Sequence, residues 1–232
     1  MKTTAIVVAA GMGSRMGQAI SKAYLPIAGR PLVLRTLDQV FLSQSVDSVI
    51  LVVAGKDVQH CQALLEADSN LRGRPWVLRE GGASRQESVY LGLQELAPDG
   101  EIVLIHDGAR PFVSPTLIDR CVATARKKDA VVVGVPVRAT IKVVSEHRQI
   151  LATPSRDSLW EIQTPQVFRR GVIIEAHEWA ARRRLQGTDD ATLVEQMGQP
   201  VFVLDGEPTN IKLTLPEDLI FAEALIKAGR IP

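Results

Sequence analysis

Small residues and cations gather near the start of the chain, in a pattern that could bind phosphate groups. They follow an apolar run at residues 6–9 and comprise Ala10, Gly11, Gly13, Arg15 and Lys22. Glycines let the backbone turn tightly and approach a ligand, and successive N–H groups in such a turn can bind an anion. A buried strand followed by a glycine-rich turn and nearby cations is typical of phosphate sites in α/β proteins. The glycines alone are equally compatible with a turn that only reverses the chain.

The spacing fits neither of two common phosphate-binding motifs. A Walker loop needs Gly-x4-Gly-Lys-Ser/Thr, but the sixth residue counted from Gly11 is Met16, with no Lys-Ser or Lys-Thr after it. A dinucleotide fingerprint needs Gly-x-Gly-x-x-Gly, which the glycines at 11, 13 and 17 miss by one position. It also needs a carboxylate about 20 residues later, and residues 28–31 contain none. These mismatches disfavour an NAD(P)-dependent oxidoreductase.

Charged residues at two later places in the chain could also belong to a site. Asp107 comes directly after the run at residues 102–105, where a carboxylate can hold Mg²⁺ against phosphate oxygens. Taken alone, Asp107 could also be a loop or capping aspartate, and Arg110 could simply pair with it. Lys212 lies between two apolar residues in a predicted strand, so its side chain must point to solvent or into a site.

The histidines do not suggest catalysis. We expect His106 to be a core histidine with satisfied hydrogen bonds, and His60, His147 and His177 to lie on the solvated surface. The sequence also offers no nucleophile with a base beside it. A phosphate monoester carries nearly two negative charges at neutral pH, so it could attack without a base, and phosphoryl transfer depends mainly on positioning and charge stabilisation.

The elements that must position these residues alternate along the chain. Apolar strands at residues 6–9, 48–54, 76–78, 102–105 and 130–135 are separated by amphipathic helices. This alternation predicts an α/β fold: a mainly parallel, Rossmann-like sheet with helices on both faces. The turns at Gly11, Gly81 and His106 each follow a strand. Ligands bind at the carboxyl ends of such strands, so we expect the three turns to share one crevice.

The alternation stops after residue 136. Residues 140–144 and 149–152 predict a short hairpin without a covering helix, which would either fold flat or contact a second chain. Further on, Thr188 and Asp189 are predicted to cap a helix, and Thr214 with Glu217 to form a capping box. We expect a single domain over residues 1–232, with a hairpin arm at about 137–156.

Composition excludes several classes of protein. The formal net charge is +1 and 23% of the 232 residues are charged, so bulk electrostatics indicate neither a nucleic-acid nor a membrane surface. The two cysteines, Cys61 and Cys121, lie in apolar helical patterns and are predicted to be buried thiols in a reducing compartment. No apolar run reaches transmembrane length and no signal peptide is evident, so a cytoplasmic location is expected.

These motifs together resemble one known family, the 2-C-methyl-D-erythritol 4-phosphate cytidylyltransferases of the non-mevalonate isoprenoid pathway. The resemblance extends nearly end to end. It rests on the opening glycine-rich segment with Arg15 and Lys22, Gly81-Gly82 with Arg85 and Ser88, His106-Asp107 with Arg110-Pro111, Pro136-Val137-Arg138 with Thr140, Arg156, Thr164-Pro165-Gln166, Thr188-Asp189 and Asn210-Ile211-Lys212.

The resemblance implies a reaction and a set of roles. The substrate's phosphate would attack the α-phosphorus of the co-substrate CTP and release pyrophosphate. CTP would be held by Ala10, Gly11, Gly13, Gly82 and Ser88, while Arg15, Lys22 and Lys212 would neutralise its α-phosphate and Asp107 would bind Mg²⁺. Arg110, Thr164 and Thr188 would face the polyol phosphate, and Thr140 and Arg156 would come from the arm of the second subunit of a homodimer.

Two positions depart from the family pattern, and one neighbouring family remains a competitor. Position 83 is Ala where some members carry an aspartate, and position 108 is Gly where Ala is frequent. Ribitol-5-phosphate cytidylyltransferases share the CTP apparatus, but Ala9-Ala10-Gly11 and Pro136-Val137-Arg138 favour methylerythritol phosphate. A non-catalytic nucleotide-binding regulator would be expected to have lost one of the three cations.

Overall fold

The computed structural model describes residues 2–11, 21–229 and 231. In this part of the chain, the main sheet has seven strands in the order β11-β7-β10-β6-β1-β4-β5. These strands are β1 (Lys2–Ala9), β4 (Ser48–Val53), β5 (Trp76–Glu80), β6 (Gly100–Asp107), β7 (Ala130–Pro136), β10 (Trp160–Arg169) and β11 (Phe202–Asp205). The predicted α/β class is therefore confirmed.

The sheet is mainly parallel, as the sequence predicts. β1 pairs in parallel with β4 and β6, β4 with β5, and β7 with β11. β10 is antiparallel to both of its neighbours, β6 and β7. The carboxyl ends of β1, β4, β5 and β6 therefore meet at one edge of the sheet, whereas β10 brings its beginning and middle there.

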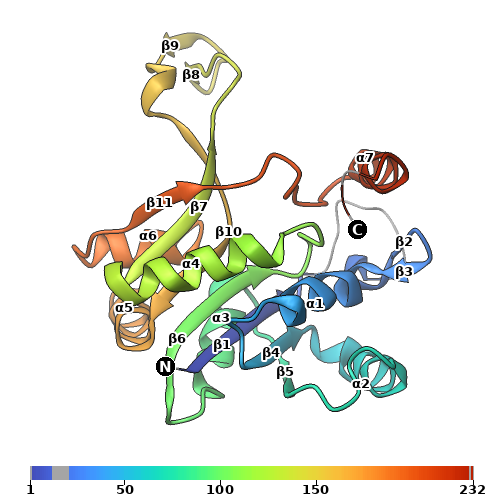
Figure 1. Cartoon of the computed structure of the whole chain (residues 1–232). Helices are drawn as coiled ribbons and strands as arrows, with labels where there is room; N and C mark the ends of the chain where they lie inside the picture. The colour runs from blue at the N-terminus through green and yellow to red at the C-terminus, as the bar shows by residue number, and fades with distance from the viewer. Residues whose placement is uncertain (1, 12–20, 230, 232) are drawn as a thin grey trace.

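Helices cover both faces of this sheet (Figure 1). They are α1 (Leu32–Leu42), α2 (Val58–Ala67), α3 (Arg85–Gln94), α4 (Pro115–Lys128), α5 (Arg170–Arg183), α6 (Asp190–Gln196) and α7 (Pro216–Lys227). Short 3-10 turns are η2 (Lys22–Tyr24), η3 (Gly55–Asp57) and η4 (Arg156–Ser158). Ser114 caps α4 through its side chain, and Asp189 caps α6 in the same way, as predicted for that helix.

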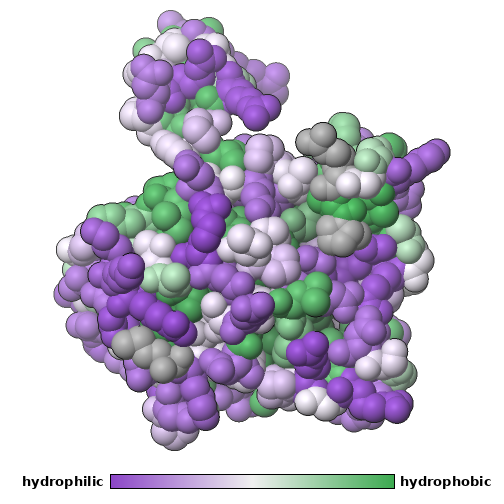
Figure 2. All heavy atoms as spheres, in the orientation of Figure 1, coloured by the Kyte–Doolittle hydropathy of each residue, from purple (hydrophilic) through white to green (hydrophobic). Residues whose placement is uncertain are grey.

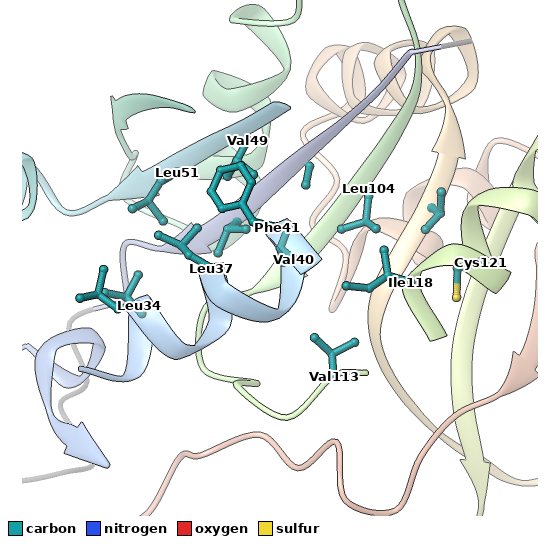
Figure 3. Packing of buried hydrophobic residues seen from close by; sticks show 14 of the residues in the cluster. Leu34, Leu37, Val40, Phe41, Val49, Leu51, Leu104, Val113, Ile118 and Cys121 are labelled. Carbon is teal, nitrogen blue, oxygen red and sulfur yellow. The ribbon is translucent and has the colours of Figure 1, made fainter. Parts of the chain in front are cut away.

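Alternate residues of the central strands pack into opposite layers. In β1, Ala5 and Val7 join the core beneath α1, α2 and α4, whereas Ile6 joins the core beneath α3, α5 and α6. Figure 3 shows the first of these cores, with Leu37 and Phe41 of α1 lying over Val49 and Leu51. A strand buried on both faces must be apolar at every position, which explains the continuous apolar runs in the sequence. Both cysteines are buried free thiols, as predicted.

A hairpin projects from the body of the molecule (Figure 1). It contains β8 (Val143–Val144) and β9 (Ile150–Ala152), and we call residues 137–156 the arm. Figure 2 shows the arm standing clear of the body. Its apolar side chains are exposed, with 58% of Ile150 and 62% of Leu151 accessible to solvent. A two-stranded hairpin is marginally stable in water, so this exposure indicates a surface that a partner could cover.

Two sequence predictions near the C-terminus are wrong. Lys212 lies in irregular backbone that precedes α7, because residues 210–214 pair with turns of the body and not with a strand. The predicted capping box of Thr214 and Glu217 does not form. Instead, the Asp218 carboxylate accepts hydrogen bonds from the backbone N–H groups of Thr214 and Leu215.

A smaller antiparallel pair, β2 (Pro26–Ile27) with β3 (Arg30–Pro31), lies beside α7. Among the described helices, none is long and apolar enough to cross a membrane.

Candidate active site

Three turns that follow strands surround one cavity of about 680 Å³. The first follows β1, the second follows β5, and the third follows β6. They contribute to its lining Ala10, Gly11, Gly81, Gly82, Arg85, Ser88, Asp107 and Gly108, and more distant segments add Lys22, Lys212 and Thr214. The crevice predicted at the carboxyl ends of these strands is therefore present.

Asp107 is the central charged group of the cavity. Its side chain is 9% exposed, and its two oxygens contact different cations: Oδ1 lies 3.0 Å from Arg85 Nε, and Oδ2 lies 2.7 Å from Lys212 Nζ. Arg110 Nε is more distant, at 4.0 Å from Oδ2. Burial alone would raise the pKa of Asp107, but the charges of Arg85 and Lys212 outweigh it and hold that pKa well below its usual range. Asp107 is therefore a fixed anion at neutral pH.

A chain of hydrogen bonds fixes the backbone of Asp107. Its N–H donates to Thr164 Oγ1 at 3.0 Å, and Thr164 Oγ1 lies 3.0 Å from His106 Nδ1. Burial lowers the pKa of His106 to about 4, so the ring is neutral at pH 7. The Thr164 hydroxyl then donates to Nδ1, which leaves Nε2–H to donate to the Arg110 carbonyl at 3.0 Å. His106 is the satisfied core histidine that the sequence predicts.

Arg110 is hydrogen-bonded to the segment that precedes α7. Its Nη1 donates to the Asn210 carbonyl at 2.7 Å, and Asn210 Nδ2 donates to the Thr164 carbonyl at 2.8 Å. The Leu213 N–H donates to the Ala109 carbonyl at 2.9 Å. These bonds attach residues 210–213 to the turn after β6 and to β10, and they bring Lys212 to Asp107 although 105 positions separate the two in the sequence.

The turn after β5 is packed closely against the turn after β1. A Cβ atom at Gly81 would lie 2.6 Å from Ala10 Cβ, so only glycine fits there. The buried Ser88 hydroxyl accepts a hydrogen bond from the Gly82 N–H at 3.1 Å and donates one to the Ser84 carbonyl at 2.8 Å. Ser84 caps α3 by accepting from the Glu87 N–H. Together these contacts fix the backbone that faces the cavity.

Lys22 enters the cavity from the other side. Its Nζ donates to the Leu213 carbonyl at 2.6 Å, so Lys22 contacts the same segment that carries Lys212. The preceding Ser21 donates through its hydroxyl to Asp57 Oδ2 at 2.6 Å, which fixes the backbone just before η2. Two lysines and the Arg85 guanidinium thus line one cavity between the glycine-containing turns, and cations grouped in this way are suited to phosphate.

Comparison with known proteins identifies the family. The sequence model of the 2-C-methyl-D-erythritol 4-phosphate cytidylyltransferases matches residues 3–228. The chain belongs to this family. A relative of that name from Geobacter metallireducens is 45% identical and aligned over 98% of both chains. Another from Pelotomaculum thermopropionicum is 44% identical, covering 99% of this chain and 97% of that one.

Solved structures agree with the sequence comparison. The 4-diphosphocytidyl-2C-methyl-D-erythritol synthase of Anaerococcus prevotii is 34% identical, with a TM-score of 0.85 over 97% of this chain and 96% of that one. The 2-C-methyl-D-erythritol 4-phosphate cytidylyltransferase of Thermus thermophilus is 33% identical, with a TM-score of 0.79 over 98% of this chain and the whole of the other. The family resemblance found in the sequence and the nucleotidyltransferase fold are both confirmed.

The structure brings together only some of the residues predicted for this family's site. Lys22, Asp107 and Lys212 line the cavity with Ala10, Gly11, Gly82 and Ser88. Gly13 and Arg15 lie outside the described residues. Arg110 and Thr164 contact the Asp107 turn from behind, and Thr188 is exposed with its hydroxyl 3.2 Å from that of Thr192. Among the described residues, Thr140 and Arg156 of the arm do not line the cavity, and Arg156 donates to the Arg138 carbonyl.

The donor set fits a magnesium ion only in combination with phosphate. Within the described residues, no group of three or more His, Cys, Asp or Glu side chains could hold a metal. Mg²⁺ is commonly bound by one or two carboxylates together with substrate phosphates and water. Asp107 alone can serve in that way, because a carboxylate offers about four lone-pair positions and its two ion pairs leave some of them open.

Sequence reasoning missed the importance of three residues. Arg85 was noted in a motif but given no role, although it is the first residue of α3 and the helix dipole disfavours a cation there. That unfavourable placement is a signal that could have been used. Asp190, the first residue of α6, accepts a hydrogen bond from Arg85 Nη1 at 2.7 Å. His177, predicted to lie on the surface, is buried and 3.1 Å from Asp190 Oδ1, so that prediction was wrong.

Proposed function

We propose that the chain transfers the cytidylyl group of CTP to the phosphate of 2-C-methyl-D-erythritol 4-phosphate. The products are 4-diphosphocytidyl-2-C-methylerythritol and pyrophosphate. The observation that carries this proposal is the ring of cations around Asp107 at the glycine-rich turns, in a chain that belongs to a family of nucleotidyltransferases.

The step needs no protein base. An oxygen of the substrate's phosphate forms a bond to the α-phosphorus of CTP, and the bond from that phosphorus to the oxygen bridging the β-phosphate breaks. Because the attacking oxygen is already anionic, the protein has to align the two phosphates and reduce their repulsion. This requirement matches a site that offers cations but, among the described residues of the cavity lining, no histidine or cysteine.

Each predicted residue has a proposed task in that step. The backbone at Ala10, Gly11 and Gly13 and the turn with Gly82 and Ser88 hold CTP. Arg15, Lys22 and Lys212 neutralise the charge that accumulates around the α-phosphate. Arg110, Thr164 and Thr188 bind the polyol phosphate from the side of β6 and α6. Asp107 is the proposed ligand for Mg²⁺, which when bound would draw negative charge from the phosphate oxygens.

We further propose that the arm makes a homodimer and completes the site. The arm's apolar side chains are exposed, including Val144 at 53% and Leu151 at 62%. Thr140 and Arg156 do not line the cavity of their own chain, and in this proposal they line the cavity of a partner. Residues 1–232 would then act as one cytidylyltransferase domain with a dimerisation arm at about 137–156. The cytoplasmic location expected from the sequence remains a prediction.

One assay tests the proposed function. Pyrophosphate release should be measured with CTP and either 2-C-methyl-D-erythritol 4-phosphate or ribitol 5-phosphate. We expect release with the former and little with the latter. Release with ribitol 5-phosphate alone would favour the sister family, and nicotinamide-dependent oxidation of a substrate without nucleotidyl transfer would favour an oxidoreductase.

A further inference from the structure

Arg85 bridges two buried carboxylates that lie on opposite sides of its guanidinium group. Its Nε contacts Asp107 Oδ1 at 3.0 Å, and its Nη1 contacts Asp190 Oδ2 at 2.7 Å. The side chain of Asp190 is 1% exposed and that of Asp107 is 9% exposed. Arginine presents its donors in a rigid plane, so two partners at different nitrogens fix both the position and the rotation of the group.

Asp190 is itself fixed by two further neighbours, His177 and Gln166. Its Oδ1 accepts a hydrogen bond from His177 Nε2 at 3.1 Å. Its backbone N–H donates to Gln166 Oε1 at 3.2 Å, and Gln166 Nε2 donates to the capping residue Asp189 at 2.6 Å. The ring of His177 is stacked near that of Tyr90, with centroids 6.2 Å apart. Asp190 therefore connects α3, α5, α6 and β10 at one buried point.

A second contact couples α3 to the same segment. The Gln86 side chain donates to the Leu185 carbonyl at 3.1 Å and accepts from the Gly187 N–H at 3.0 Å. The start of α3 is thus attached to the chain just before α6, on the N-terminal side of the predicted substrate residue Thr188. Movement of Asp190 would be transmitted to Arg85 and from there to Asp107.

We propose that Asp190, oriented by His177, is a positioning residue that holds Arg85 against Asp107 for the transfer reaction. It acts through Arg85 and does not touch substrate. The effect of Asp190 on kcat rests on the proposed function, whereas its effect on the position of Arg85 does not.

The contact geometry predicts what a change at Asp190 would do. Asp190 accepts from His177 through one oxygen and from Arg85 through the other. Asparagine has one oxygen and one NH₂ group, so it can accept from only one of these donors and presents a donor to the other. Arg85 would then be held firmly by Asp107 alone and could rotate about its remaining contact.

The test compares Asp190→Asn with a matched control. Arg30 also bridges two aspartates, Asp38 and Asp68, with Nη1 at 2.8 Å from Asp68, and none of the three lines the cavity. Asp68→Asn therefore breaks the same kind of bridge elsewhere. We expect Asp190→Asn to lower kcat by about tenfold to hundredfold, the range for a lost charge-assisted hydrogen bond. KM for CTP should change by less than about threefold, because the glycine-rich turns are intact.

A spectroscopic readout follows Arg85 directly. In protein labelled with ¹⁵N-arginine, the Nε–H signal of Arg85 can be assigned by its loss in Arg85→Lys. We expect Asp190→Asn to shift and broaden this signal and Asp68→Asn to leave it unchanged. His177→Phe should reproduce the effect more weakly, whereas His177→Gln, which retains an N–H donor, should restore kcat and the signal.

Specific results with these variants would overturn the proposal. Asp190→Asn with kcat within about twofold of wild type, or with reduced kcat but an unchanged Arg85 signal, would overturn the proposal. Equal damage from His177→Phe and His177→Gln would overturn the part assigned to His177. The Arg85 signal requires no reaction, so a wild-type protein that fails to release pyrophosphate would refute the proposed function and leave this test in force.

Discussion

Replacing Lys212 by methionine tests the central electrostatic claim about the cavity. Methionine keeps an unbranched apolar stem but removes the charge that lies 2.7 Å from Asp107 Oδ2. If Lys212 also stabilises the α-phosphate in the transition state, turnover should fall by about 10²- to 10³-fold, as it does when one preorganised donor is removed. Steady-state pyrophosphate release gives this number directly.

The same substitution has a smaller, separable effect on stability. A hydrogen bond between charged groups contributes about 1.5–3 kcal/mol. The Lys212 side chain is 39% exposed and Arg85 still pairs with Asp107, so we expect a loss at the low end of this range or below, about 1 kcal/mol. Urea unfolding at pH 7 measures it.

The stability loss should depend on pH in a defined direction. The pKa of Asp107 is lowered in the folded protein, so the carboxylate contributes stability above the pKa of the unfolded chain and loses it as pH falls. The difference between wild type and Lys212→Met should therefore be complete at pH 7 and shrink below about pH 4, where the unfolded carboxyl takes up a proton.

A surface pair provides the control for this experiment. Lys2 lies 2.6 Å from Asp99, but both side chains are more than half exposed. Lys2→Met should leave turnover unchanged and stability nearly so. Near-normal turnover in well-folded Lys212→Met would refute the catalytic role, and a stability difference that persists unchanged at acidic pH would refute the pairing with Asp107.

Three further predictions concern the rest of the site. Lys22→Ala should lower turnover by about 10²-fold or more with folding nearly intact, and normal kinetics would remove Lys22 from the mechanism. EDTA should abolish activity and Mg²⁺ restore it, while Asp107→Asn should weaken the response to Mg²⁺; full activity in chelator would contradict this. Mixing Arg156→Ala with Lys22→Ala chains should give activity above either parent through heterodimers with one intact site, and no recovery despite proven subunit exchange would place Arg156 in its own chain's site.

The sequence was most informative where one rule governs a whole element. A strand covered on both sides must be apolar throughout, so residues 48–54 and 102–105 could be assigned to strands without any tertiary information. The rule that parallel strands end at the same edge then placed Gly11, Gly81 and Asp107 in one cavity. Both arguments need only the pattern of the local chain.

Two of the predictions that were wrong depend on contacts outside the local sequence. His177 lies in a helix rich in charged residues and resembles a surface histidine, but Asp190 gives it a buried partner 13 positions away. Lys212 is flanked by Ile211 and Leu213, which suggested a strand, although the segment is fixed instead by hydrogen bonds to Ala109 and Arg110. Neither partner could be identified from local sequence, because a hydrogen bond across the fold leaves no periodic pattern.

The cavity's charge is local and does not reflect the composition of the chain. The protein has a formal net charge of only +1, yet Lys22, Arg85 and Lys212 all line one cavity that contains Asp107. A cation held against a buried carboxylate stays in place without substrate, so it has no reorganisation to undergo when negative charge develops. Asp190 extends this arrangement by taking up part of the Arg85 charge from outside the cavity. The site therefore combines a positive lining for phosphates with buried carboxylates behind it, which allow Arg85 and Lys212 to remain close together in the free protein.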